Sequence, residues 1–349
     1  MKKGKKGSFL LIFCLIMLTA CNGMITKRYS NTNNKLSQIL DVKNLQIKSD
    51  DRYGSLRIID PIVENKNYVF YIEKGKKIIK INKHNKEKTA IITFKNLNKG
   101  GLSLEGNYLY YIYNQEVYKC DFKGKYTKIL SKGNLKKSEI NAKVVSVKMY
   151  HNKLYLIMEN YTDLYVIQYN EKEYKVLIKD YMRQLCFGEE NLYYIDREGA
   201  GIYQINLNTL KQHRIRGIKW YKNYMFDDHP SYLEITVYNR NLYYTRWEDT
   251  GDRSQQVMYK YKKNKKDEKI FEFQGGASSI ADSQKVIADE VVYDSKHEGM
   301  QVFDLKTKKS YIIKKPMYKT GSINFLLDDV ILYKGDKVSN KVYIFKRIK

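Results

Sequence analysis

The sequence predicts an all-β fold built from many short strands, and two observations support this prediction. After the first twenty residues, short runs rich in Tyr, Ile, Val and Leu alternate with turns that contain Asn, Gly, Asp and Lys. Such alternation is typical of strands joined by tight turns, and helical periodicity is weak. The same pattern also returns at intervals of about 45 residues, which indicates an internal repeat.

The clearest copy of the repeat is the run Asn191–Asp196, which a short turn joins to Gly201–Leu207 and then to Gln212–Ile215. Seven copies align, two of them more weakly than the rest. Their equivalent residues are Tyr71, Tyr111, Leu156, Tyr194, Tyr244, Tyr293 and Tyr333. The steps between these positions run from 38 to 50 residues.

Repeats of this length, each with four short strands, predict the blades of a β-propeller, because one blade cannot cover both of its faces whereas a ring of blades can. An apolar run before each copy, such as Ser55–Asp60, Val144–Tyr150 or Leu233–Tyr238, is the expected first strand. The last copy lacks a fourth strand. We therefore expect a seven-bladed propeller whose last blade is completed by the segment Val42–Ile47, which removes two open sheet edges. Six blades are the alternative, because the copy at Tyr293 is weak.

The first twenty residues have the features of a secretory signal, with a basic start and the apolar run Ser8–Ala20. This run is too short to span a bilayer, which takes about 20 apolar residues. It ends in Leu18-Thr19-Ala20-Cys21, which resembles the lipobox of bacterial lipoproteins. The resemblance implies cleavage before Cys21 and a diacylglyceryl group on its thiol, a stable membrane anchor. The alternative is an ordinary secretory signal that happens to precede a cysteine.

Three regions are expected from these features. Residues 1–20 form the signal peptide, residues 21–41 the lipidated cysteine with a polar, flexible tether, and residues 42–349 the propeller domain. The domain is thereby placed on the extracytoplasmic face of the cell membrane. Its two cysteines, Cys120 and Cys186, are too few for a disulfide framework, so we expect buried free thiols.

The chain is strongly basic. The signal contributes four of its 64 lysines and arginines and none of its 38 acids, so the mature chain keeps 60 basic residues and a formal charge of +22. Such a charge favours anionic partners such as acidic lipid headgroups or wall polymers. The basic residues are scattered, however, and abundant lysine also accompanies AT-rich codon usage. An exported protein rarely meets nucleic acid, so we expect no nucleic-acid partner.

The sequence contains no P-loop, dinucleotide fingerprint, His-Glu-x-x-His motif or EF-hand loop. Its five histidines lie in different repeats without the spacing of metal ligands. We therefore expect no catalytic residue, metal or cofactor. Carboxylates that converge at the axis of the ring would escape this search, so a propeller enzyme that acts on envelope glycans is the alternative.

Two long connections interrupt the repeat, residues 217–232 and residues 246–255. A connection between blades and a turn between second and third strands emerge on the same face of a propeller, so the two should lie side by side. They hold both tryptophans and an acidic island. The predicted ligand-binding residues are Trp220, Tyr221, Tyr224, Asp227, Asp228, Trp247, Glu248, Asp249 and Asp252. Aromatic faces beside carboxylates suit a sugar, a peptide or a cationic group. The alternatives are an insertion whose tryptophans pack onto the blade, and a calcium site, for which no known loop spacing fits.

The strand motifs Tyr193-Tyr-Ile-Asp196 and Tyr243-Tyr-Thr-Arg246 resemble those of the Tyr-Trp-Thr-Asp (YWTD) propellers of lipoprotein receptors. The domain is similar as well to tyrosine-rich propeller domains of unknown function in low-GC Gram-positive bacteria. The resemblance covers residues 42–349 and concerns architecture, since no blade has the tryptophan of the motif. With the anchor, we expect a monomeric, non-catalytic binding or scaffold module at the cell envelope, which binds a protein, a peptide or an anionic wall polymer. A factor that assists the folding or assembly of exported proteins is a further alternative.

Overall fold

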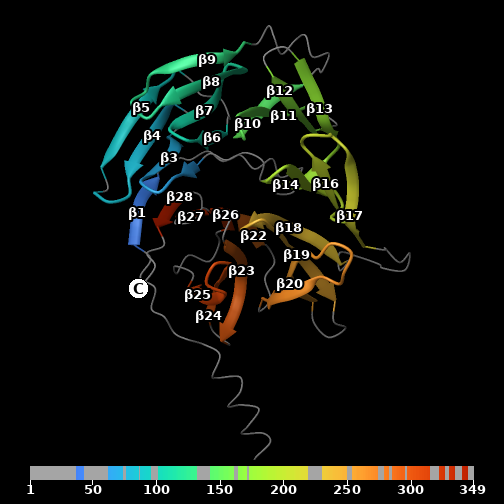
Figure 1. Ribbon diagram of the computed structural model, residues 1–349. Helices are drawn as coiled ribbons and strands as arrows, with labels where there is room; N and C mark the ends of the chain where they lie inside the picture. The colour runs from blue at the N-terminus through green and yellow to red at the C-terminus, as the bar shows by residue number, and fades with distance from the viewer. Residues whose placement is uncertain are drawn as a thin grey trace, which may run out of the picture.

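The structure is a computed structural model, drawn in Figure 1. It describes residues 37–42, 62–73, 76–85, 87–95, 101–131, 142–160, 164–170, 173–218, 230–249, 254–273, 279–282, 285–294, 297–314, 322–326, 330–334 and 340–344. Within these ranges every regular element is a β-strand. They accordingly contain no helix with the length and apolar character needed to cross a membrane. The described strands form seven four-stranded antiparallel sheets, which are the blades of a β-propeller.

Six blades are each made of four consecutive strands. In order, blade one is β2 (Ile62–Glu64), β3 (Tyr68–Glu73), β4 (Lys77–Asn82) and β5 (Lys88–Thr93), blade two is β6 (Leu102–Glu105), β7 (Tyr108–Tyr113), β8 (Glu116–Asp121) and β9 (Tyr126–Leu130), and blade three is β10 (Lys143–Tyr150), β11 (Lys153–Glu159), β12 (Leu164–Asn170) and β13 (Glu173–Lys179). Blade four is β14 (Met182–Gly188), β15 (Asn191–Asp196), β16 (Gly201–Asn206) and β17 (Gln212–Gly217), blade five is β18 (Ser231–Tyr238), β19 (Asn241–Asp249), β20 (Ser254–Lys260) and β21 (Glu268–Glu272), and blade six is β22 (Ser279–Asp282), β23 (Lys285–Asp294), β24 (His297–Asp304) and β25 (Lys309–Lys314).

The seventh blade joins the two ends of the described chain, which confirms the predicted closure of the ring. Its strands are β26 (Ser322–Leu326), β27 (Val330–Lys334), β28 (Asn340–Ile344) and β1 (Ser37–Val42). β1 pairs antiparallel with β28, with Ser37 opposite Ile344 and Val42 opposite Asn340.

Two strands lie at positions other than those predicted. The closing strand begins at Ser37, and residues 43–47 of the segment predicted for it lie outside the described ranges. The sheet order makes β2 the first strand of blade one, and the run Ser55–Asp60 that was predicted for it lies outside the described ranges. The first strands predicted at Val144–Tyr150 and Leu233–Tyr238 are confirmed as β10 and β18.

In six blades the aligned residue of the repeat is the fourth residue of the second strand, as Tyr111 is in β7 and Tyr244 in β19. The fourth residue of β23 in blade six is Ala288, so the alignment of Tyr293 with these residues is wrong. The reason is the length of β23, which has ten residues. β22 pairs only with Lys285–Ala288, and Tyr293 belongs to the far part of the strand.

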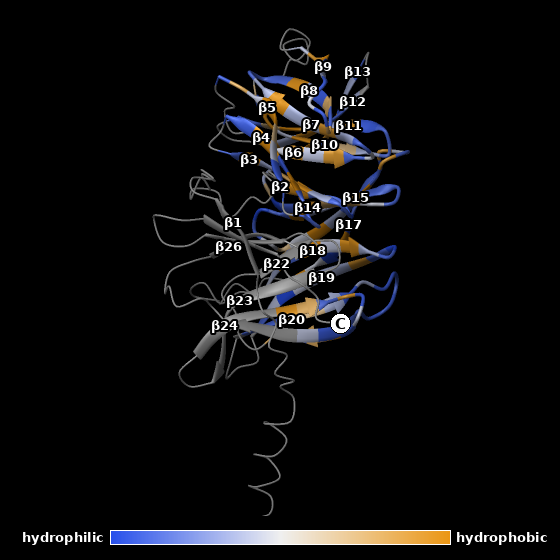
Figure 2. Ribbon diagram, turned by 90° about the vertical axis from the view of Figure 1, so that its left-hand side faces the viewer, coloured by the Kyte–Doolittle hydropathy of each residue, from blue (hydrophilic) through white to orange (hydrophobic). Residues whose placement is uncertain are grey.

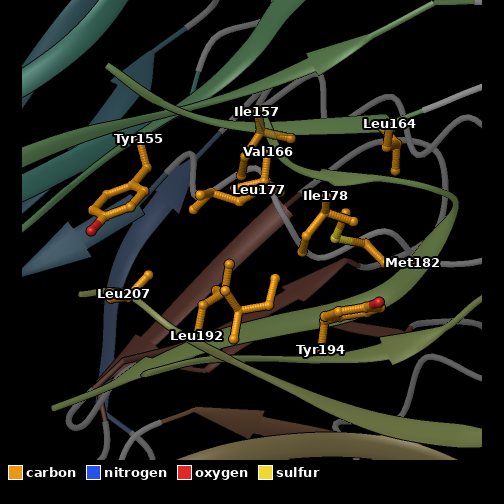
Figure 3. Packing of buried hydrophobic residues seen from close by; sticks show 11 residues of the cluster. Tyr155, Ile157, Leu164, Val166, Leu177, Ile178, Met182, Leu192, Tyr194 and Leu207 are labelled. Carbon is orange, nitrogen blue, oxygen red and sulfur yellow. The ribbon is translucent and has the colours of Figure 1, made fainter. Parts of the chain in front are cut away.

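The hydrophobic core is divided into layers between neighbouring blades. Side chains alternate between the two faces of a sheet, so each blade contributes to two layers. Figure 3 shows the layer between blades three and four, where Ile157 and Val166 pack against Leu192 and Tyr194. In Figure 2 the turns at the ends of the blades are largely hydrophilic, whereas apolar residues lie on the stacked strands. Full burial of one such side chain is worth about 1.5–3 kcal/mol, so the stacking of blades is what stabilises the ring.

Among the described residues neither Cys120 nor Cys186 forms a disulfide, as the sequence predicts, but only one of the two is buried as predicted. Cys120 in β8 is buried, and Cys186 in β14 is partly exposed. Burial raises the pKa of the Cys120 thiol to about 12, which keeps it protonated at neutral pH.

The strand order gives the propeller two faces. We call the side that carries the connections between blades and the turns between second and third strands the upper face. The turns between first and second strands and between third and fourth strands lie on the lower face. Neighbouring blades approach one another through their first strands, such as β14 and β18, so the first strands are the inner ones.

Several third strands end on the lower face in an Asn or Asp that shapes the turn. The Oδ1 atoms of Asn82, Asp121, Asn206 and Asp304 accept the backbone N–H two residues on, at 2.8–3.0 Å. In blade five the carboxylate stands at the far end of the turn. There Asp267 accepts the backbone N–H of Lys262 at 2.8 Å.

Candidate functional site at the junction of blades four and five

The two long connections begin and end on the upper face of blades four and five. β17 ends at Gly217 and β18 begins at Ser231, which pairs with Trp247 of β19. Six of the predicted ligand-binding residues lie outside the described ranges, namely Trp220, Tyr221, Tyr224, Asp227, Asp228 and Asp252. The described part of the site is therefore its base.

The second connection is shorter than predicted because the strands beside it are longer. β19 and β20 pair as far as Asp249 and Ser254, so residues 246–249 continue a strand and do not belong to a loop. Asp249 is the last residue of β19.

Trp247 and Glu248 lie on opposite faces of the blade, because successive residues of a strand alternate. Trp247 is half-buried and shares its face with Tyr243, which packs against blade six. Glu248 shares its face with Tyr244, which packs against blade four. These two residues therefore do not combine into one patch.

The Glu248 carboxylate is engaged within its own blade. Its Oε1 accepts hydrogen bonds from Nε of Arg246 at 3.0 Å and from the Tyr259 hydroxyl. Burial, followed by this hydrogen bond, raises the pKa of Tyr259 to about 12. The carboxylate is held between a cation and a phenol.

Carboxylates paired with a cation also occur in two blades that have no long connection. In blade two, Glu116 of the third strand accepts the Tyr118 hydroxyl at 2.6 Å and pairs with Lys128 at 3.1 Å. In blade one, Lys88 contacts Glu73 of the second strand at 2.6 Å. These glutamates stand at different positions of the repeat, so a paired carboxylate is not confined to the blade with the long turn.

The arginines of this junction were not among the residues predicted from the sequence. Eleven of the 64 basic residues are arginine; seven of them lie between Arg183 and Arg253, and none lies between Arg57 and Arg183. Blades one to three thus use lysine alone, whereas blades four and five use both. Arginine and lysine are not equivalent, because only the planar guanidinium binds a carboxylate or several carbonyls in fixed geometry. This uneven distribution is the signal that points to the junction.

Arg216 at the end of β17 fastens the outer strands of blade four to blade five. Its Nε and Nη2 bind the two carboxylate oxygens of Asp267 at 2.6 and 2.7 Å. Nη2 also donates to the carbonyls of Lys262 at 2.8 Å and Lys265 at 3.2 Å. The guanidinium lies 4.4 Å from the ring centroid of Tyr261. A bidentate pair of this kind is strong and specific in direction.

Asp267 also accepts the hydroxyl of Tyr244 at 2.6 Å. Burial alone would raise the pKa of Asp267, but the hydrogen bonds from Arg216 and Tyr244 outweigh it and lower the pKa. Burial, and then the hydrogen bond to Asp267, raise the pKa of Tyr244. The phenol remains a donor and the carboxylate an acceptor over the whole neutral range.

Two more arginines join the same pair of blades. Near the axis, Nη1 of Arg183 in β14 donates to the Tyr232 carbonyl of β18 at 3.1 Å. On the lower face, Arg240 pairs with Glu189 at 2.8 Å. A Cβ at Gly199, which has φ +70°, would lie 2.8 Å from Nη1 of Arg183 and 2.7 Å from the Tyr232 carbonyl, so only glycine fits there.

Arg214 is exposed on the upper face, and contacts with the backbone of its own blade hold its guanidinium in place. A Cβ on Gly217 would lie 2.5 Å from its Cζ, so the guanidinium rests directly on the backbone. It donates to the Ala200 carbonyl at 2.6 Å and to the Arg216 carbonyl at 3.2 Å. Among the described residues, Nη1 of Arg214 has no acceptor. The described ranges also contain no group of three or more His, Cys, Asp or Glu that could hold a metal ion.

No protein-family model and no curated protein matches the chain. Among solved structures, an oligogalacturonate lyase from Vibrio parahaemolyticus has a similar fold, with a TM-score of 0.57 and 12% identity over 91% of this chain and 96% of that chain. The N-terminal domain of Nup159 gives 0.46 and 10% over 88% and 95%, respectively. A chain of a nidogen/laminin complex gives 0.37 and 16% over 58% and 73%. At these identities the likeness to the lyase shows the β-propeller fold alone.

Proposed function

We propose that this chain is a non-catalytic binding module, tethered to the outer face of the cell membrane through Cys21, whose ligand contacts the upper face at the junction of blades four and five. The observation that carries the proposal is that Arg183 and Arg216 join blade four to blade five beside the two ends of the first long connection. Binding residues are commonly placed on loops that a rigid scaffold supports.

The carboxylates at this junction favour binding over acid–base catalysis. A catalytic acid or base has to exchange a proton with its substrate, so its oxygen atoms have to be available. Glu248 is engaged by Arg246 and Tyr259, and Asp267 is engaged by Arg216, Tyr244 and a backbone amide. These groups stabilise the base of the site.

The exposed arginine suggests the class of ligand. Arg214 lies flat on the blade and keeps donors that no described residue uses. A preorganised guanidinium suits a carboxylate or phosphate group, such as those of an anionic wall polymer or an acidic peptide. The exposed arginine thus favours an anionic ligand, whereas the acidic residues of the two connections favour a cationic one.

The test measures binding of the mature chain to a purified anionic wall polymer. Arg214→Ala, and separately the pair Trp220→Ala with Trp247→Ala, should each weaken binding at least tenfold, whereas Arg240→Ala should leave it unchanged. Arg240 is the matched control, because its side chain is 83% exposed and lies on the lower face.

Equal affinity of all these variants would contradict the assignment of the site. The non-catalytic part of the proposal has its own test. Incubation with oligogalacturonate, the substrate in the name of the lyase of similar fold, should give no turnover. Cleavage of that polymer would support the alternative of a glycan-acting enzyme.

A further inference from the structure

The lower face carries many exposed lysines in the turns between third and fourth strands. They are Lys123, Lys125, Lys211, Lys263, Lys265, Lys266, Lys306 and Lys308, in blades two, four, five and six. Within the described ranges none of them forms an ion pair. Of the acids at these turns, Asp121 and Asp304 cap the backbone of their own turns, Asp267 pairs with Arg216, and Glu268 pairs with Lys262.

The positive charge is unevenly distributed around this face. Blade four has one exposed lysine in its turn, Lys211, and the acids Glu189 and Glu190 in the neighbouring turn. Blades five, six and two carry the other seven lysines, three of them in blade five and two each in blades six and two.

The N-terminal strand leads away from this same face. Ser37 pairs with Ile344, the last residue of β28, and third strands end on the lower face. The chain between Cys21 and β1 has fifteen residues and a reach of at most about 55 Å. A connection of this length limits the distance to a membrane but leaves the orientation of the domain open.

We propose that the lower face is a docking surface for anionic phospholipid headgroups, and that it holds the propeller against its own membrane with the upper face turned outward. This inference rests on the proposed anchor at Cys21. The two acyl chains of the proposed anchor hold the chain at the membrane, and a cluster of basic residues would fix which face of the domain meets the lipid. Basic residues near an anionic surface each contribute modestly, so the number of lysines on one face matters.

In this orientation the proposed binding site is also accessible to ligands outside the membrane. The junction of blades four and five opens on the upper face, so docking through the lower face leaves it directed away from the lipid. The attraction is electrostatic and acts over a Debye length of about 10 Å at 0.1 M salt. It should therefore weaken as salt is raised.

The experiment measures co-sedimentation of the mature chain with vesicles, using Cys21→Ser so that no lipid is attached. The parent should bind vesicles that contain phosphatidylglycerol at least tenfold more tightly than vesicles of phosphatidylcholine. The lower-face variant Lys123→Gln, Lys263→Gln, Lys266→Gln, Lys306→Gln should lose at least tenfold in affinity for the anionic vesicles.

The matched control removes the same charge from the upper face, with Lys76→Gln, Lys77→Gln, Lys143→Gln and Lys179→Gln, all at exposed lysines. It should lose less than threefold. Equal losses in the two variants would overturn the docking surface, and so would a parent that does not distinguish the two lipids. Circular dichroism confirms that both variants are folded. The vesicle assay uses neither the anchor nor the wall polymer, so it can fail without affecting the proposed function. The proposed function is tested separately, by the mass of the lipidated Cys21 and by binding to the wall polymer.

Discussion

Blades two and five have a buried tyrosine at the same position of the repeat, but within the described part of the chain only the tyrosine of blade five has a hydrogen-bond partner for its hydroxyl. Tyr111 and Tyr244 are each the fourth residue of a second strand, and each stacks on a tyrosine of the third strand at 5.4 and 5.5 Å, respectively. Both are almost fully buried, with 1% and 3% exposure. The Tyr244 hydroxyl donates to Asp267, whereas the buried Tyr111 hydroxyl has no partner among the described residues.

The difference comes from where the turn between third and fourth strands places its carboxylate. In blade two, Asp121 stands at the start of the turn and accepts the N–H groups of Lys123 and Lys125. In blade five the carboxylate stands at the end of the turn, where Asp267 binds Tyr244 of its own blade and Arg216 of blade four. The turn carboxylate of blade two therefore stabilises only its own turn, whereas that of blade five connects two blades.

The largest effect is expected from removing this carboxylate. Asp267→Ala leaves the Arg216 guanidinium without its bidentate partner and the Tyr244 hydroxyl without an acceptor. We expect a loss of about 3 kcal/mol in the free energy of unfolding, since breaking a partly buried pair leaves a charge uncompensated. Urea titration of parent and variant measures it, and a loss below about 1 kcal/mol would contradict the role of Asp267 as the fastener.

Acid pH provides a control for that variant. The pKa of Asp267 is lowered in the folded state, so its stabilisation is complete above the unfolded value of about 4 and is lost as pH falls through the lowered pKa. The difference in unfolding free energy between parent and Asp267→Ala should therefore narrow in that interval. A constant difference down to low pH would indicate that packing, rather than charge, explains the effect.

The next effect concerns the hydroxyl in blade five. Tyr244→Phe keeps the ring and its stacking but removes the hydrogen bond to an ionised carboxylate. We expect a loss of about 1.5 kcal/mol, because hydrogen bonds to charged groups contribute more than neutral ones. The measurement is again urea unfolding, and Asp267→Ala with Tyr244→Phe should cost less than the sum of the two changes, since both act on one network.

The fold could be predicted from the sequence to a large extent, because it depends on a local pattern that the chain repeats. Strand runs, turns and the missing fourth strand of the last copy are visible without any structure. The position of Tyr293 could not be predicted, because the apolar run around it looks like a copy although β22 pairs only with the start of β23. Local pattern does not reveal where pairing ends.

The candidate site was less accessible to sequence reasoning. Trp247 and Glu248 are neighbours in sequence, but the continuation of β19 through both places them on opposite faces. Arg216 and Asp267 are 51 residues apart and belong to different blades, so no motif joins them. Only the crowding of arginines between positions 183 and 253 marks the region, and it identifies no partner for any of them.

The smallest change in unfolding free energy is expected for Tyr111, and it tests the comparison of blades two and five most directly. Tyr111→Phe removes a buried hydroxyl that no described group satisfies, so the folded state loses no hydrogen bond while the cost of burying the hydroxyl disappears. Unfolding should show no loss of stability and a gain of up to about 1 kcal/mol, opposite in sign to Tyr244→Phe. A loss comparable to that of Tyr244→Phe would mean that the hydroxyl in blade two has a partner after all, such as a buried water, and that the two blades satisfy this position equally well.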